Sequence, residues 1–328
     1  MFNEQLSGIF YTTNSNETST NPSMVPSQIA SILFPCMVFI GVICNLLTLI
    51  IMRRRRLSHL STSFYMRIIA IADISVLLLG LCIMLRHGEH EKQSLLLQSK
   101  YSCNILSVAF YIVSDTSVWL VCMMSADRCI AVTRPLHASS ICTIRRAKII
   151  VCILLLCTSL INIHFLFTYD SSNKQCRPYQ IYEFFIDRIW PWIDAAVYSV
   201  LPFILLLTIN LIIVHSLFQV RHSTSNLDID QLHGIRNKSK LSSSMSRRLT
   251  TMLLVATFFF LLTSFPIVLL EIYSTIYAQW NNVYIQFYFK PVCEILQYLN
   301  HCVSFRRSLI LNYKIIYLDE FFSLRNDG

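Results

Sequence analysis

The sequence predicts an all-α membrane protein, a bundle of seven transmembrane helices. Hydrophobic residues make up 54% of the 328 residues and charged residues only 14%, whereas soluble chains carry roughly 25% charged residues. Seven separate apolar stretches approach or exceed the roughly 20 residues that a helix needs to cross a bilayer. The basic residues gather beside these stretches, as they do in membrane-flanking loops. Lipid is therefore the expected solvent.

The expected spans follow one another with mostly short connections. They are Ile29–Met52, Phe64–Leu85, Ile105–Ala126, Ala147–Tyr169, Trp192–Phe218, Leu249–Tyr273 and Val283–Phe305. Residues 1–28 form an extracellular N-terminal segment and residues 29–305 the helix bundle. Residues 219–248 form a serine-rich third cytoplasmic loop, and residues 306–328 a short atypical tail.

The distribution of lysine and arginine predicts the orientation. The N-terminal segment contains neither residue, whereas a run of four arginines follows the first span. Cytoplasmic loops carry the excess of positive charge, so we expect a multi-pass protein of the plasma membrane with its N-terminus outside. Asn16 then lies in a glycosylation sequon on the outer side. The net charge of +9 forms no basic face interleaved with aromatics, so no nucleic-acid partner is expected.

Two polar residues stand in the middle of the first and second spans. They are Asn45 in G-V-I-C-N-L-L and Asp73 in I-A-I-A-D-I-S. An ionisable group in a membrane span is costly and is a functional candidate by default. Asp73 either hydrogen-bonds neighbouring helices or belongs to a polar cluster that holds a cation and changes state.

The third span carries the most specific motif. Cys103 and Arg128 are 25 positions apart, about 37 Å of helix, which exceeds the roughly 30 Å of hydrocarbon. They therefore lie at opposite ends. Asp127 to His137 reads D-R-C-I-A-V-T-R-P-L-H. This string closely resembles the D-R-Y-x-A-V-x-x-P-L signature of rhodopsin-like G-protein-coupled receptors, with Cys129 in place of the tyrosine.

The resemblance covers residues 29–305 and implies roles for further residues. Cys103 and Cys176 resemble the disulfide that ties the third helix to the second outer loop. Asp127 and Arg128 would couple to a heterotrimeric G protein, with an apolar contact from Leu136. The residues of the implied polar core are Asn45, Asp73, Ser117 and Asn300, with an allosteric sodium ion on Asp73 and no other cofactor. The residues implied in helix movement are Pro202, Phe260 and Pro266.

The seventh span departs from the family. N-P-x-x-Y, or its N-F-x-x-Y variant, is expected there, but Ser304 and Phe305 are followed by Arg306-Arg307, and Ser308 takes the place of the tyrosine. Asn210 stands where the fifth helix usually has a tyrosine. These departures predict a receptor that couples poorly.

The expected ligand is an extracellular peptide. Amine receptors have an aspartate seven residues after the third-helix cysteine, and this chain has Phe110 there. The expected pocket residues are Phe110, Tyr111 and Ser114, with Glu271 and Glu294 near the mouth. Two carboxylates suit a basic peptide side chain, or else they reach water or pair with Lys290. T-S-F-P and L-Q-Y-L-N-H resemble invertebrate neuropeptide receptors.

Two other classes of protein fit less well. A channel or transporter would line one path with charges or show an internal repeat, and we find neither. The chain is not expected to be an enzyme, because it has no metal-ligand spacing, nucleophile elbow or phosphate loop.

Overall fold

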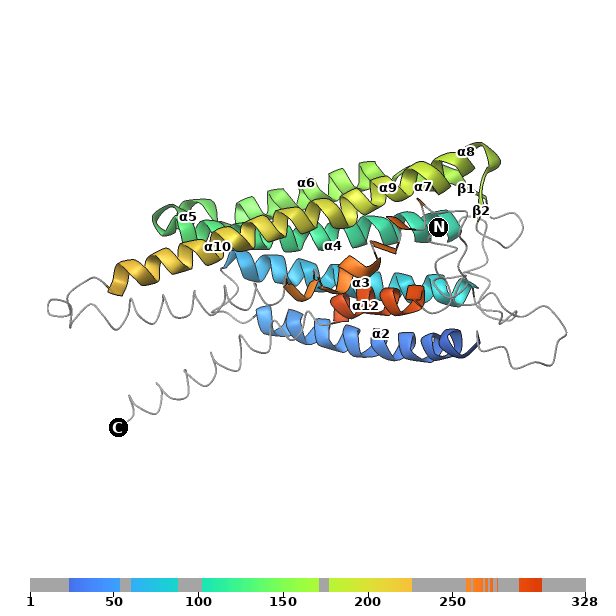
Figure 1. The fold of residues 1–328 in the computed structure, drawn as a ribbon, viewed down its shortest axis with the longest axis horizontal. Helices are drawn as coiled ribbons and strands as arrows, with labels where there is room; N and C mark the ends of the chain where they lie inside the picture. The colour runs from blue at the N-terminus through green and yellow to red at the C-terminus, as the bar shows by residue number, and fades with distance from the viewer. Residues whose placement is uncertain are drawn as a thin grey trace.

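The computed structural model describes residues 24–53, 60–87, 102–170, 177–225, 258–260, 262–267, 269–270, 272–273, 276 and 289–302. Over these residues the long helices run side by side along the long axis of the molecule (Figure 1). The prediction of an all-α helical bundle is confirmed. The small exception is the two-residue pair of strands β1 (Tyr169–Asp170) and β2 (Arg177–Pro178), which are antiparallel.

Five helical segments are long and apolar enough to cross a membrane. They are Ile32–Met52, Ser61–Ile83, Ser102–Thr133, Ile144–Thr168 and Gln180–Ser216, and they correspond to the first five predicted spans. The sixth and seventh predicted spans are described only in part, by the short apolar helix Phe258–Ile267 and by α12 (Lys290–Cys302).

The helix α4 (Ser102–Thr133) lies at the centre of the bundle. It packs against α3 (Ser61–His87), α6 (Ile144–Asn162) and α10 (Leu201–Ser225), while α2 (Met24–Met52) packs against α3 and α12. Because α4 contacts helices on several sides, most side chains in its middle are buried. A polar residue on α4 therefore faces another helix rather than lipid.

The fifth span begins earlier and ends later than predicted. Helical structure starts at Gln180, not at Trp192, and runs through α8 (Gln180–Phe184), η1 (Phe185–Ile189), α9 (Trp190–Asp194) and η2 (Ala195–Val200) into α10. The wide π-type turns of η1 lie just before Pro191 and those of η2 just before Pro202, two residues that have no N–H to donate. The helix also continues to Ser225, so the predicted loop 219–248 begins inside α10.

The fourth span ends in a compact turn. After α6 the chain forms α7 (Phe165–Thr168) and then β1, while the helix α5 (Pro135–Ile141) connects α4 to α6. Thr143 caps α6, where its hydroxyl accepts the Arg146 N–H at 3.4 Å. The two ends of the bundle therefore differ: α7 and β1 lie at the end that carries Cys103, and α5 lies at the end that carries Arg128.

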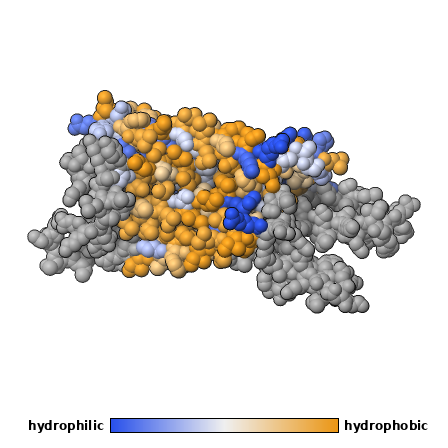
Figure 2. All heavy atoms as spheres, turned by 180° about the vertical axis from the view of Figure 1, so that it is seen from behind, coloured by the Kyte–Doolittle hydropathy of each residue, from blue (hydrophilic) through white to orange (hydrophobic). Residues whose placement is uncertain are grey.

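The outer surface of the bundle is apolar. Figure 2 shows hydrophobic side chains over most of the visible face, with hydrophilic side chains gathered toward its ends. Large apolar side chains on three different helices are more than half exposed, namely Phe39 and Ile50 of α2, Leu160 of α6 and Leu211 of α10. Apolar patches of this extent mark contact with lipid or another partner. The chain is a multi-pass membrane protein.

Candidate functional site

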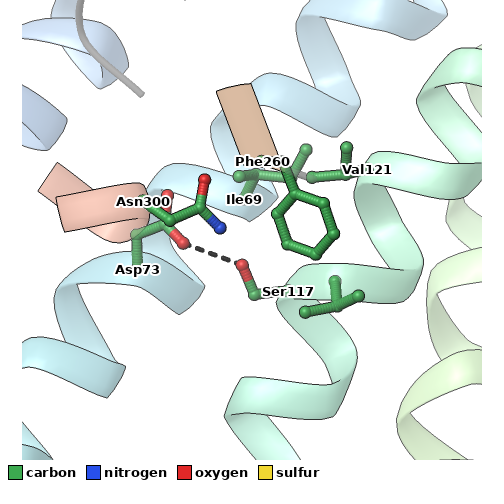
Figure 3. Close-up of a pocket in the computed structure, with 7 residues that line it drawn as sticks. Ile69, Asp73, Ser117, Val121, Phe260 and Asn300 are labelled. Atoms are coloured by element: carbon green, nitrogen blue, oxygen red, sulfur yellow. Dashed lines mark hydrogen bonds between the residues drawn. The ribbon is translucent and has the colours of Figure 1, made fainter. Parts of the chain in front are cut away.

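A buried carboxyl group lies at the centre of the site. Asp73 of α3 is 2% exposed, and the Ser117 hydroxyl of α4 donates to its Oδ1 at 2.7 Å (Figure 3). His301 of α12 places Nδ1 2.8 Å from the same oxygen. An ionised Asp73 only accepts hydrogen bonds, so the tautomer of His301 that satisfies this contact is the one that carries its proton on Nδ1. The predicted proximity of Asp73 and Ser117 is thus seen in the structure, whereas His301 is an additional partner.

The other two expected members of the polar core lie next to this contact. Asn300 lines a small cavity with Asp73 and Ser117, and its side-chain oxygen has no hydrogen-bond partner among the described residues (Figure 3). Asn45 of α2 contacts two main-chain oxygens. Its Nδ2 donates to the Gly41 carbonyl at 3.0 Å and to the His301 carbonyl at 2.9 Å.

The surroundings of Asp73 bear on the sodium ion that the resemblance implied. A cation is held by oxygen lone pairs, but the Oδ1 of Asp73 already accepts from Ser117 and His301. A serine hydroxyl can turn its hydrogen away from a cation, whereas an imidazole Nδ1–H directed at the carboxylate cannot. The residues present do not fit a sodium ion on this oxygen.

The Arg128 end is organised by the preceding aspartate. The Arg128 Nη2 lies 2.7 Å from Oδ2 of Asp127. The same oxygen accepts from the Ser61 hydroxyl at 2.8 Å and from the Thr62 hydroxyl at 3.3 Å. Asp127 thus holds the arginine while it joins the end of α4 to the start of α3.

An exposed apolar side chain lies beside this end. Leu136 of α5 is 89% exposed. Next to α5, the Cys142 thiol donates to the Asp127 carbonyl at 3.5 Å. Burial, followed by the negative charge of Asp127, raises the pKa of Cys142 to about 11. The chain therefore presents an apolar residue next to a polar network at the place where the resemblance puts a G protein.

The Cys103 end contains the expected ligand-pocket residues of α4. Phe110, Tyr111 and Ser114 are all buried. Phe110 packs in a cluster with Phe34 and Tyr298, and the Tyr111 ring stacks on that of Phe165 at 4.4 Å. Phe110 and Tyr111 thus pack closely against aromatic side chains of other helices.

Several predicted site residues lie outside the residues that the structure describes. Cys103 is disulfide-bonded, but Cys176 lies outside the described residues, so the pairing of these two stays a prediction. Asn16 and Glu271 also lie outside them. Glu294 belongs to α12, and its side chain is not described.

The three residues expected to take part in helix movement lie on two helices. The Pro202 carbonyl of α10 faces the Cys122 thiol of α4 at 4.0 Å. Phe260 is buried against the cavity at Asp73, while Pro266 is half-buried further along the same helix (Figure 3). A movement of Phe260 would therefore change the polar core directly.

Sequence reasoning missed two groups of polar residues. Asp115 of α4 and Asn162 of α6 are buried, with Nδ2 of Asn162 donating to Oδ2 of Asp115 at 2.7 Å. His301 is the other omission. Both Asp115 and His301 are ionisable side chains inside apolar runs, so the rule that singled out Asp73 applied equally to them.

Comparisons with known proteins agree with this arrangement. The family model for the 7 transmembrane receptor (rhodopsin family) matches residues 44–304. A probable G-protein coupled receptor of Caenorhabditis elegans is 25% identical over 213 residues, which cover 60% of this chain and 49% of the relative. Neuromedin-U receptor 1 of Rattus norvegicus is 30% identical over 123 residues, 36% of this chain and 28% of the relative. The matched regions span half or less of these relatives.

Proposed function

Because the chain belongs to the rhodopsin family of seven-transmembrane receptors, we propose that it is a cell-surface receptor for an extracellular peptide. In this proposal the N-terminus lies outside the plasma membrane, and the Arg128 end meets a heterotrimeric G protein in the cytoplasm. The family is one of receptors and not of enzymes, and its match also favours a receptor over a channel or transporter.

The observation that carries the proposal is the arrangement of Asp127 and Arg128. Asp127 accepts from Ser61 of α3 while it holds the guanidinium of Arg128 at 2.7 Å. The arginine is thus kept at the end of the bundle by contacts that depend on the spacing of α3 and α4. A ligand that favours a different helix arrangement by its differential affinity would release the arginine toward a partner.

The polar core connects this end to the rest of the bundle. Asp73 joins α3, α4 and α12 through Ser117 and His301, and Phe260 packs beside it. In the proposed mechanism, a ligand at the Cys103 end shifts the sixth helix about Pro266. Phe260 then moves against the polar core, and the cavity beside Arg128 opens to the G protein.

A peptide is the ligand class that the site supports best. Phe110 offers no carboxylate to an amine ligand, and its buried ring packs against apolar neighbours. An unpaired ammonium in such surroundings is unfavourable. The similarity to a neuromedin-U receptor adds support for a peptide. Glu271 and Glu294 would bind a basic side chain of that peptide.

A peptide-library screen on cells that express the chain tests this proposal, with small amines as controls. For an active basic peptide, replacing Glu271 or Glu294 with glutamine should weaken binding by about 1.5–3 kcal/mol, the range for hydrogen bonds to charged groups. Val292→Ala, at an exposed residue of the helix α12 that also carries Glu294, serves as the control. A potent small-amine agonist, or unchanged peptide potency in both glutamine variants, would count against the proposal.

A second candidate is a receptor that binds its ligand but couples weakly. Ser308 and Asn210 favour it, because each replaces a tyrosine hydroxyl that the family places near the Arg128 end. The two candidates differ in signalling and not in ligand binding.

A further inference from the structure

We propose that the His301 imidazole, rather than a sodium ion, completes the polar core beside Asp73, so that the state of this protein does not depend on sodium. The inference rests on the geometry around Asp73 and not on the ligand class.

His301 is directed at Asp73 by the way α12 is attached to α2. Asn45 of α2 donates to the His301 carbonyl at 2.9 Å, and the Cys302 thiol donates to the Met37 carbonyl at 3.3 Å. Two consecutive residues of α12 are thus tied to α2. These contacts help to set the rotation of α12, which directs the imidazole at Asp73 of α3.

The contact between His301 and Asp73 is buried and close. Their side chains are 3% and 2% exposed, and Nδ1 lies 2.8 Å from Oδ1. A charge in such surroundings is stable only with a partner and hydrogen bonds. The imidazole N–H supplies that partner from within the chain, as a bound cation would supply it from solution.

The same contact excludes a cation on this oxygen. An N–H group presents its positive end, and in a poorly screened interior a cation placed on Oδ1 would be repelled by it. The imidazole ring also occupies space next to the carboxyl group. Removing the ring should therefore create a sodium site from oxygens that are already there, those of Asp73, Ser117 and Asn300.

The cavity beside Asp73 gives a competing arrangement. Asn300 has a buried oxygen without a partner among the described residues, and the rest of the lining is mainly apolar: Ile69, Val118, Val121 and Phe260. A water molecule suits this place. A sodium ion bound there in the native protein would overturn the proposal.

Thermal unfolding of the purified full chain tests the proposal without any receptor ligand. The protein is heated in NaCl, KCl or choline chloride at one ionic strength and one pH. The native chain should unfold at the same temperature in all three salts. His301→Ser, which exchanges the N–H for a hydroxyl oxygen, should gain a rise in unfolding temperature in NaCl alone.

Two variants show whether that gain arises at this site. In His301→Ser, a second change Asp73→Asn should abolish the sodium response, and His301→Phe, which fills the space without an oxygen, should show none. If His301→Ser does not fold, His301→Asn offers an amide oxygen instead. A sodium-specific rise in the native chain that Asp73→Asn removes would refute the proposal, and so would a folded serine variant without a response. Neither result depends on whether the ligand is a peptide.

Discussion

Asp115 has a single hydrogen-bond partner among the described residues, Asn162. We therefore expect the loss of Asn162 to destabilise the protein. Nδ2 of Asn162 donates to Oδ2 of Asp115 at 2.7 Å, and the other oxygen of Asp115 has no partner among these residues. Asn162→Ala should lower the free energy of unfolding by about 1.5–3 kcal/mol, because the carboxyl group loses its one donor. Thermal unfolding of the detergent-solubilised chain measures this.

A double-mutant cycle supplies the control for this pair. Asp115→Ala with Asn162→Ala should cost less than the two single changes added together, because the second change removes the group that the first left unpaired. Additive losses would mean that the two side chains do not depend on each other.

Cys142 gives a prediction outside the membrane-spanning segments. Burial and the charge of Asp127 raise its pKa to about 11. A raised pKa means that the thiol stays protonated near neutral pH, and only the thiolate reacts with alkylating agents. Iodoacetamide should modify Cys142 far more slowly than an ordinary thiol at pH 8, and faster as the pH rises toward 11.

Asp127→Asn removes the second cause of this shift and should speed alkylation at the same pH. Peptide-resolved mass spectrometry follows the reaction, with a short cysteine-containing peptide added to the same sample as the reference thiol. Equal rates for Cys142 in the native chain and for the peptide would be inconsistent with the raised pKa.

Three helices approach one another closely at Gly41. A Cβ added there would lie 2.6 Å from Cδ1 of Leu77 on α3 and 2.8 Å from Sγ of Cys302 on α12. Gly41→Ala should therefore destabilise the chain by about 1–3 kcal/mol, the usual effect of overpacking. Gly80→Ala is the matched control. A Cβ added at Gly80 would lie 3.0 Å from the Tyr298 hydroxyl oxygen, its nearest neighbour, so this change should destabilise the chain less. A harmless Gly41→Ala would mean that α2 and α12 have room to separate.

The sequence at the end of the seventh predicted span leads us to expect weak coupling. Arg306 and Arg307 would cost about 2.5–3.5 kcal/mol each if placed deep in the bilayer, so the helix should leave the membrane just after Phe305. Two tyrosine hydroxyls of the family are also replaced, by Ser308 and Asn210. We compare the native chain with a variant whose segment after Val303 is rebuilt to N-F-x-x-Y with a short amphipathic helix. The agonist should cause less dissociation of heterotrimeric G proteins with the native chain than with this variant. Equal signalling at matched surface expression would show that this departure is harmless.

Across the whole molecule, hydropathy and one motif predicted correctly that the helices exist, but they did not predict the residues at which the helices begin and end. The spans through Asp73 and Arg128 were found because apolar length and the D-R-C string are local signals. The start at Gln180 was missed because residues 180–191 include charged side chains that lower the hydropathy, although the helix continues through them.

Contacts between helices were predictable only in part. Asp73 and Ser117 were expected together from the family resemblance and are in contact. The contact of His301 with Asp73 depends on the rotation of α12, and that rotation is set by the bonds of Asn45 and Cys302 to neighbouring backbone. No periodicity within a short helix reveals such a rotation, so the sequence could mark His301 as a candidate but could not predict its contact with Asp73.

The central claim is that an extracellular peptide changes the Arg128 end so that it engages a G protein. Its most direct test is agonist-driven dissociation of heterotrimeric G proteins in cells that express the native chain or Arg128→Ala at equal surface levels. At least one peptide of a neuropeptide library should cause dissociation with the native chain, and amines should not. Arg128→Ala should bind that peptide with similar affinity and fail to release the G protein. Peptide binding followed by equal dissociation in the variant, or by an ion current without any dissociation, would contradict the account.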